Sequence, residues 1–454
     1  MADRNPLLDV DDDDELLDPM GEDAEAQGLS QVPYGKVGGL GVLAGTAFLF
    51  GEMAGSGILA LPKAVVNANW IGLPLIFICG VLAAYNGINL GRCWNIMLER
   101  WPQYRNNVRD PYPAMAEQAF GKPMKYIVRV CMHLTLFGVA TVVLLLASQN
   151  IQSILDQFGA KHISFCYWLI IIAALLTPCT WLGTPKNFWP IATGAGLATI
   201  LAGILTVVAI WTDSRYFKAI HTGPKFESLF SAFGAILFVF GGASTFPTVQ
   251  HDMKEPKKFK YAAFAAFSCL ILMYLPVAAA GFFAYGDAVQ TNILQSLPPG
   301  GLRITIEILV TGHLVLAFVI IVNPMEQDLE EWLNIPLHFN WKRAVLRTVL
   351  VGFILFAAQS VPHFGAIMDL IGGSTVTFLT FVAPPLFYLK FKSMHGYWFY
   401  NPLPLHIKVL NVEIIIIGVI GGVASTYSAI LELSSKGTFV PPCYVNMNGA
   451  EGHG

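Results

Sequence analysis

The stretch GEMAGSGILALP, residues 51–62, decides the fold, because it places three glycines and a proline inside an apolar segment long enough to cross a membrane. A second stretch, FGGASTFP at residues 240–247, repeats this cluster of glycine and serine followed by a proline. Glycine disfavours helix. The two stretches occupy corresponding positions if the first five and the next five apolar segments form two halves of a repeat. The sequence therefore predicts that the first and sixth segments are interrupted helices, an arrangement typical of secondary transporters.

Composition places the rest of the chain in a membrane. Hydrophobic residues make up 55% of it and charged residues 13%, against roughly a quarter charged in soluble domains. Apolar runs predict an all-α polytopic membrane protein with about eleven transmembrane helices. The expected spans are 40–64, 72–98, 126–154, 163–182, 188–211, 229–250, 261–286, 302–325, 344–362, 365–389 and 411–433.

The placement of positive charge predicts the orientation. With the N-terminus in the cytosol, 20 of the 27 lysines and arginines fall on the cytosolic side of these spans. We therefore expect a transmembrane domain over residues 36–433 and a short lumenal or extracellular tail over residues 434–454.

Residues 1–35 are acidic and lack hydrophobic periodicity, which predicts a disordered cytosolic tail. The tail holds two acidic dileucine patterns that resemble signals read by clathrin adaptors. Their acids and leucines are Asp3, Leu7, Leu8, Asp12, Leu16 and Leu17. The expected address is an endosomal, lysosomal or vesicular membrane, and the alternative is a solubilising tail on a plasma-membrane protein.

The two glycine clusters are the candidate substrate site. The unwound backbone of an interrupted helix can hold the charged groups of a small solute. The alternative is that glycines merely allow helices to pack closely, since residues 51–55 also form a GxxxG pattern. The candidate substrate-binding residues are Gly55, Ser56, Gly57, Phe240, Gly241, Gly242, Ser244 and Thr245.

Ionisable residues inside the spans are candidates for proton coupling. Glu52 lies within the first glycine cluster, where an ionised carboxylate costs at least about 2.5 kcal/mol unless it faces a cavity or a partner. Glu307, His313 and Asp369 raise the same question in later spans. For each of the four, the alternative is a protonated or paired structural role.

Several classes of protein are disfavoured. The sequence contains no P-loop, which disfavours a nucleotide-driven pump, and no selectivity-filter motif, which disfavours an ion channel. The seven cysteines show no metal-ligand spacing, so buried thiols are expected rather than a metal site. We expect no enzymatic activity, no cofactor and no nucleic-acid partner.

Three stretches resemble the amino acid/auxin permease family. GSGILALPKA at residues 55–64 is similar to the family's first-helix pattern. VRDPYPAMAEQAFG at residues 108–121 is similar to its second loop, and FGAILFVFGGASTFPTVQHDMKEPKKF at residues 233–259 to its sixth helix and following loop. The overall pattern is most similar to the branch of vacuolar, vesicular and lysosomal amino-acid transporters.

This resemblance implies a five-plus-five inverted repeat with one additional helix, and an amino acid held between broken helices one and six. It implies transport driven by protons, or by sodium as in some branches. The pattern departs from the family at Met53, where several relatives have Asn, and Glu52 is not a general feature, so the coupling ion stays open. The alternative function is an amino-acid sensor that signals to cytosolic partners through the acidic tail.

Overall fold

The computed structural model describes residues 38–105, 108, 110–159, 163–181, 188–213, 219–223, 225–336, 339–396, 402–434 and 442–447. Residues 35–454 form one compact unit. Over the described residues this unit is helical, with two isolated bridges and no strand. The acidic tail and its two dileucine patterns lie outside the described residues.

Eight helical stretches are long and apolar enough to cross a membrane, and one of them, residues 42–100, contains two helices. Two shorter apolar helices cover residues 165–181 and 226–239. The all-α polytopic architecture is confirmed, while the count of eleven spans stays a prediction.

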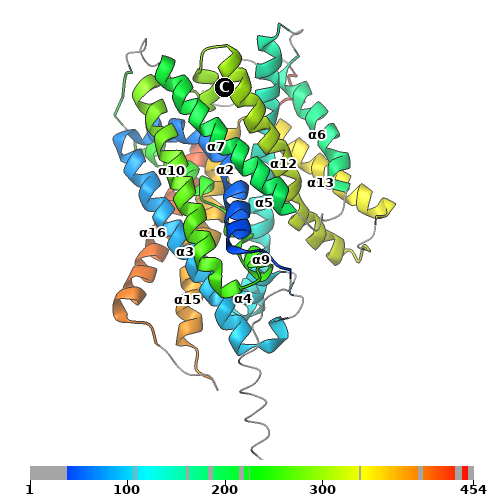
Figure 1. The fold of residues 1–454 in the computed structure, drawn as a ribbon, viewed down its shortest axis with the longest axis vertical. Coiled ribbons are helices and arrows are strands. Elements are labelled where there is room, and N and C mark those ends of the chain that lie inside the picture. Colours follow the sequence, from blue (N-terminus) through cyan, green and yellow to red (C-terminus); the bar gives the residue numbers. More distant parts are fainter. Residues whose placement is uncertain are drawn as a thin grey trace, which may run out of the picture. The chain divides into compact units, whose positions relative to one another are not determined.

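Each helix can be assigned to one of the two predicted halves of the chain, and most of the helices are labelled in Figure 1. In the first half they are α2 (Val42–Ala68), α3 (Gly72–Arg100), α4 (Pro111–Phe120), α5 (Lys122–Gln157), α6 (Phe165–Trp181) and α7 (Phe188–Asp213). In the second half they are α8 (Phe226–Val239), α9 (Phe246–His251), α10 (Phe259–Tyr285), α11 (Ile293–Ser296), α12 (Gly301–Trp332), α13 (Trp341–Ser360), α14 (Phe364–Ile371) and α15 (Ala383–Ser393). The additional helix is α16 (Leu405–Ser434).

Packing between the halves matches a repeat. Helix α12 packs on α5, and α13 packs on α6, so helices at corresponding positions contact one another. Helix α2 packs against α7, α8 and α10, and Figure 1 shows it in blue among the green helices. Two π-helical segments, η5 (Gly372–Val376) and η6 (Phe378–Val382), join α14 to α15.

The sixth segment is interrupted as predicted. Helix α8 ends at Val239, and α9 begins at Phe246 with Pro247 in its first turn. Between them the chain makes short turns, in which the Gly241 N–H donates to the Phe238 carbonyl.

The first segment differs from the prediction, because α2 runs unbroken from Val42 to Ala68. Its glycines serve close packing instead. A Cβ on Gly55 would lie 2.3 Å from Nε2 of His313, and a Cβ on Gly57 would lie 2.5 Å from the Tyr274 hydroxyl. A continuous helix keeps its backbone hydrogen bonds in apolar surroundings, so the packing alternative describes these two glycines.

A disulfide between Cys166 and Cys443 was not foreseen from the sequence. The two cysteines are 277 residues apart, and the bond joins the start of α6 to the segment that follows α16. That segment also stacks its Tyr444 ring on Phe356 of α13. Buried thiols were expected for the cysteines, and for this pair the expectation is wrong. Cys79 and Cys93 are buried thiols, whereas Cys179 and Cys269 are exposed on the surface of the protein.

Buried ion pairs join α12 to α13. Arg347 binds Glu330 at 2.6 Å and Glu326 at 2.9 Å, and Arg343 binds Glu330 at 2.9 Å. All four side chains are buried. Removing one partner of such a group is costly because it strands a charge, so we assign the network to the docking of these two helices.

Candidate functional site

A polar-lined space, here called the large cavity, lies where α2, α5 and α12 meet the break between α8 and α9. It encloses about 450 Å³ of empty space, opening included. Its lining residues are Glu52, Met53, Ser56, Thr135, Leu136, Val139, Phe238, Val239, Gly241, Gly242, Ser244 and Ile321.

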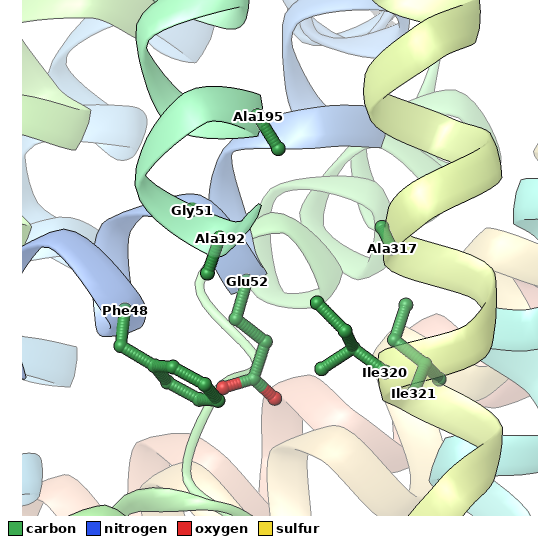
Figure 2. A pocket seen from close by; sticks show the side chains of 8 residues that line it. All are labelled: Phe48, Gly51, Glu52, Ala192, Ala195, Ala317, Ile320 and Ile321. Carbon is green, nitrogen blue, oxygen red and sulfur yellow. The ribbon is translucent and has the colours of Figure 1, made fainter. Parts of the chain in front are cut away.

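A second space, here called the small cavity, lies between α2, α7 and α12. Its lining is apolar apart from one carboxyl, and consists of Phe48, Gly51, Glu52, Ala192, Ala195, Ala317, Ile320 and Ile321. Figure 2 shows the carboxyl of Glu52 pointing between the Phe48 ring and Ile320. Glu52 and Ile321 line both cavities, so this carboxyl stands at their junction.

Glu52 is hydrogen-bonded to the helix break. The Thr245 hydroxyl lies 2.5 Å from the Glu52 Oε2 atom and 3.1 Å from the Gly242 carbonyl oxygen. A threonine hydroxyl has one proton to donate. If Glu52 is protonated, it donates to Thr245 and Thr245 donates to Gly242, which satisfies all three groups. The protonation state of Glu52 is thereby linked to the geometry of the break.

The predicted substrate-binding residues divide into two groups. Ser56, Gly241, Gly242 and Ser244 line the large cavity, and Thr245 contacts it through Glu52. The others pack elsewhere. Gly55 and Gly57 contact His313 and Tyr274 as described above, and the Phe240 ring packs against the rings of Phe267 and Tyr274.

His313 stands close to the small cavity. Its Nδ1 atom lies 3.1 Å from the carbonyl oxygen of Ala195, a cavity-lining residue, and 2.9 Å from the Thr199 hydroxyl. Thr199 donates to the same carbonyl. The carbonyl can only accept, so Nδ1 carries the proton, and Nε2 faces α2 at Gly55.

Glu307 lies away from both cavities. It is ten residues before Ala317, the nearest lining residue of α12, which corresponds to about 15 Å along the helix axis. Its carboxylate accepts hydrogen bonds from Arg303 at 2.9 Å, Ser153 at 2.7 Å and Gln157 at 3.0 Å. These contacts suit a tie between α12 and α5.

Asp369 also lies outside the lining of both cavities. It sits on α14, where the Ser231 hydroxyl of α8 donates to its carboxylate. Of the four coupling candidates, the structure therefore places Glu52 in the cavity lining and His313 beside it.

The residues of α5 that line the large cavity were not predicted from the sequence. Thr135, Leu136 and Val139 form it, and the Thr135 hydroxyl donates to Thr375 in the π-helical segment η5 at 2.8 Å. Short π-helical segments occur frequently at functional sites. An apolar helix without clear periodicity gave no signal for which of its faces would line a cavity.

A charged network lies in the N-terminal part of α5, next to the stretch VRDPYP. Arg129 binds Asp110 at 2.8 Å and Asp328 at 3.5 Å, and His133 binds Asp328 at 2.7 Å. Burial, reinforced by the neighbouring Asp328 carboxylate, raises the pKa of Asp110 to about 6. The network joins the loop before α4 to both α5 and α12.

Comparison with known proteins identifies the family. Residues 38–431 match the family described as "Transmembrane amino acid transporter protein". Amino acid transporter AVT1D of Arabidopsis thaliana is 26% identical over 399 residues, which cover 85% of this chain and 69% of the relative. Amino acid transporter AVT1J of the same plant is 25% identical over 444 residues, covering 94% and 96%.

A solved structure supports the fold alone. A mutant of the Eremococcus coleocola manganese transporter is similar with a TM-score of 0.55 at 12% identity, over 87% of this chain and 88% of that one. The family expected from the three quoted stretches is confirmed. The chain is a multi-pass membrane protein that belongs to the family of transmembrane amino acid transporter proteins.

Proposed function

We propose that this protein is a secondary active transporter that moves amino acids by alternating access, driven by protons. The observation that carries the proposal is the position of Glu52, at the junction of two cavities and hydrogen-bonded to the interrupted sixth segment. The relatives' names, amino acid transporters AVT1D and AVT1J, support amino acids as the substrate, and the polar groups in the lining of the large cavity support it as the binding site.

The lining of the large cavity suits a neutral amino acid. Ser56, Ser244 and the backbone at Gly241 and Gly242 offer polar groups for the substrate's α-amino and α-carboxyl ends. Its apolar wall is formed by Leu136, Val139, Phe238, Val239 and Ile321. Apolar walls with a few convergent polar groups are the usual design of a small-molecule site.

Glu52 is the proposed proton carrier. It is the one ionisable side chain in the described lining of either cavity. Protonation removes a charge from the cavity and lets the carboxyl donate to Thr245, which in turn holds Gly242 in the break. Loss of the proton reverses both effects, so proton binding and the shape of the break are coupled.

Glu52→Gln tests this assignment in proteoliposomes. A glutamine cannot exchange a proton but can still donate to Thr245, so uptake driven by an imposed proton gradient should be lost while counterflow exchange continues. Glu413→Gln, on an exposed part of α16, is the matched control. Gradient-driven accumulation at the wild-type level in Glu52→Gln would overturn the assignment.

We further propose an endosomal or lysosomal location with the C-terminus in the lumen. The disulfide between Cys166 and Cys443 supports this orientation, because disulfides persist on the non-cytosolic side of cellular membranes. Replacing Leu7, Leu8, Leu16 and Leu17 with Ala should move the protein to the cell surface. If that variant keeps its intracellular location, the dileucine motifs do not determine the location and clathrin adaptors do not bind them for this purpose.

The same proteoliposomes distinguish a transporter from the alternative function, an amino-acid sensor. A transporter accumulates amino acid against its gradient when protons flow inward. A sensor binds amino acid without net uptake.

A further inference from the structure

A polar and basic patch interrupts the lipid-facing surface where α3, α15 and α16 meet. It is here called the basic patch and is defined by the cations Arg92, Lys392 and Lys408. The three helices are labelled at the lower left of Figure 1, and the ends that carry the patch are predicted to face the cytosol. Neither cavity is lined by residues of these helices, so the patch is a separate feature.

On α3 the patch continues a stripe that faces lipid. Tyr85, Asn89 and Arg92 share one helix face, because they are spaced by four and three residues, and the exposed Val81 lies one turn earlier on that face. Arg92 is exposed and lies eight residues before Arg100, the last residue of α3, which is about 12 Å along the helix axis. A charged side chain within a span is costly unless it finds a partner or reaches the membrane surface.

The guanidinium of Arg92 is held in place by two neighbours. Its Nη1 atom donates to the Asn89 side-chain oxygen at 3.0 Å. The group also hydrogen-bonds to Tyr388 of α15 and lies 5.9 Å from the centre of that ring. An arginine carries five N–H donors, so these contacts leave donors of Arg92 for an anion. None of the ion pairs between described residues includes Arg92.

Helix α15 adds a second cation. Lys392 lies four residues after Tyr388, on the same helix face, and is partly exposed. Lys392 and Arg92 both interact electrostatically with the Cys93 thiol of α3, which places the two cations around one point. An anion at this point therefore lies within the field of both.

Helix α16 adds an amide and a third cation. The buried Asn411 side chain donates to the Tyr85 hydroxyl at 2.8 Å and accepts from the Asn89 amide at 3.4 Å. These bonds tie α16 to the polar face of α3 and fix Asn89, the residue that orients Arg92. Lys408 is exposed three residues before Asn411, on the neighbouring turn of the same helix face.

The acids nearest in sequence lie elsewhere. Glu99 binds Lys257 at 3.1 Å, and Glu413 is two residues from Asn411, about 200° around the helix. Residues 397–401, between α15 and α16, lie outside the described residues, and their sequence YWFYN carries no charge. Three helices thus bring cations to one place at the edge of the lipid-facing surface.

We propose that the basic patch binds the phosphate of an anionic phospholipid from the leaflet that it faces. Arginine suits a phosphate because its planar fork of N–H groups bonds two oxygens at once. Lys392 and Lys408 add positive charge, and the acyl chains lie along the exposed apolar side chains of α3 and α16, such as Val81 and Val412. Basic pockets between membrane helices bind lipid headgroups in this way. The lipid links α16, the additional helix, to α3 and α15.

The alternative is an arginine that only extends its charge to the membrane surface. Such a residue needs a positive charge, which lysine keeps, and needs no fixed orientation. The proposed site instead requires a planar guanidinium held against Asn89 and Tyr388. Arg92→Lys therefore separates the two accounts.

Native mass spectrometry of the purified full-length protein in a neutral detergent measures the affinity. The probe is dioctanoyl phosphatidic acid, and dioctanoyl phosphatidylcholine is the zwitterionic lipid of the same chain length. Arg92→Gln and Arg92→Lys should each weaken binding of phosphatidic acid at least about tenfold, the loss expected for a charge-assisted hydrogen bond. Lys392→Gln should weaken it about fivefold and serves as the test if the Arg92 variants do not fold. Phosphatidylcholine should bind weakly and equally to all of these proteins.

Lys342→Gln is the matched control, because Lys342 is an exposed cation of α13 at the end predicted to face the same side of the membrane. It should bind phosphatidic acid as the wild type does. Equal affinities of Arg92→Gln and Lys342→Gln would overturn the site, and wild-type affinity in Arg92→Lys would favour the arginine that only extends its charge. Glycerol 3-phosphate, the same headgroup without acyl chains, should bind at least about tenfold more weakly than the lipid. Equal binding would make the ligand a soluble phosphate and overturn the lipid assignment.

Discussion

Gly55→Ala is the sharpest test of the unbroken first helix. The new Cβ would lie 2.3 Å from Nε2 of His313, where ordinary contact begins at 3.4 Å, so the imidazole must retreat by about 1.1 Å. That movement pulls Nδ1 from Ala195 and Thr199. Overpacking costs about 1–3 kcal/mol, and stranding buried polar groups about another 1–3 kcal/mol. Alanine's better helix propensity returns about 1 kcal/mol, leaving a net loss of about 1–5 kcal/mol.

The assay is thermal unfolding of the purified protein, paired with uptake. Gly312→Ala is the matched control, because it lies on the exposed side of α12 where a Cβ meets nothing within 4 Å. It should be neutral or slightly stabilising. Combining Gly55→Ala with His313→Ala removes the obstructing ring and should recover part of the loss. A Gly55→Ala protein as stable as the wild type would refute the packing argument and favour an unwound helix at this position.

Two further predictions concern the ends of the helices. Burial and Asp328 raise the pKa of Asp110 from 3.8 to about 6, so the folded protein holds that proton more tightly than the unfolded chain. Wild-type stability, measured by thermal unfolding, should therefore fall as pH rises from about 4 through 6. Asp110→Asn should lack that part of the fall. An identical pH dependence of stability in the two proteins would contradict this prediction. Cys166→Ser should free the Cys443 thiol, which a maleimide-polyethylene glycol reagent would label without prior reduction, and should lower stability by roughly 2–4 kcal/mol. Under denaturing, non-reducing conditions the wild type should take up one label fewer than this variant, because five of its seven cysteines are free. A wild type that takes up one label more would show that the disulfide does not form.

The sixth-segment break could be predicted because its causes are local. Gly241 and Gly242 weaken the helix, and Pro247 suits the first turn of the helix that follows. The same reasoning failed in the first segment. The fate of Gly55 and Gly57 depends on His313 and Tyr274, which approach from other helices and leave no mark on the local sequence.

Non-local chemistry was hidden for the same reason. Cys166 and Cys443 are 277 residues apart, and the sequence around each cysteine does not indicate which cysteine it pairs with. In the candidate site, Glu52 stood out from the sequence because a charge in an apolar span is costly. Thr135 did not, because a hydroxyl can bond to its own helix and needs no cavity.

The proposed function requires that protons and amino acid move together through a site governed by Glu52. A pH-sensitive dye sealed inside proteoliposomes tests it directly. Adding a neutral amino acid outside, with no imposed gradient, should acidify the interior of wild-type vesicles and not of Glu52→Gln vesicles. Entry of labelled amino acid into wild-type vesicles without any change of internal pH would contradict the account.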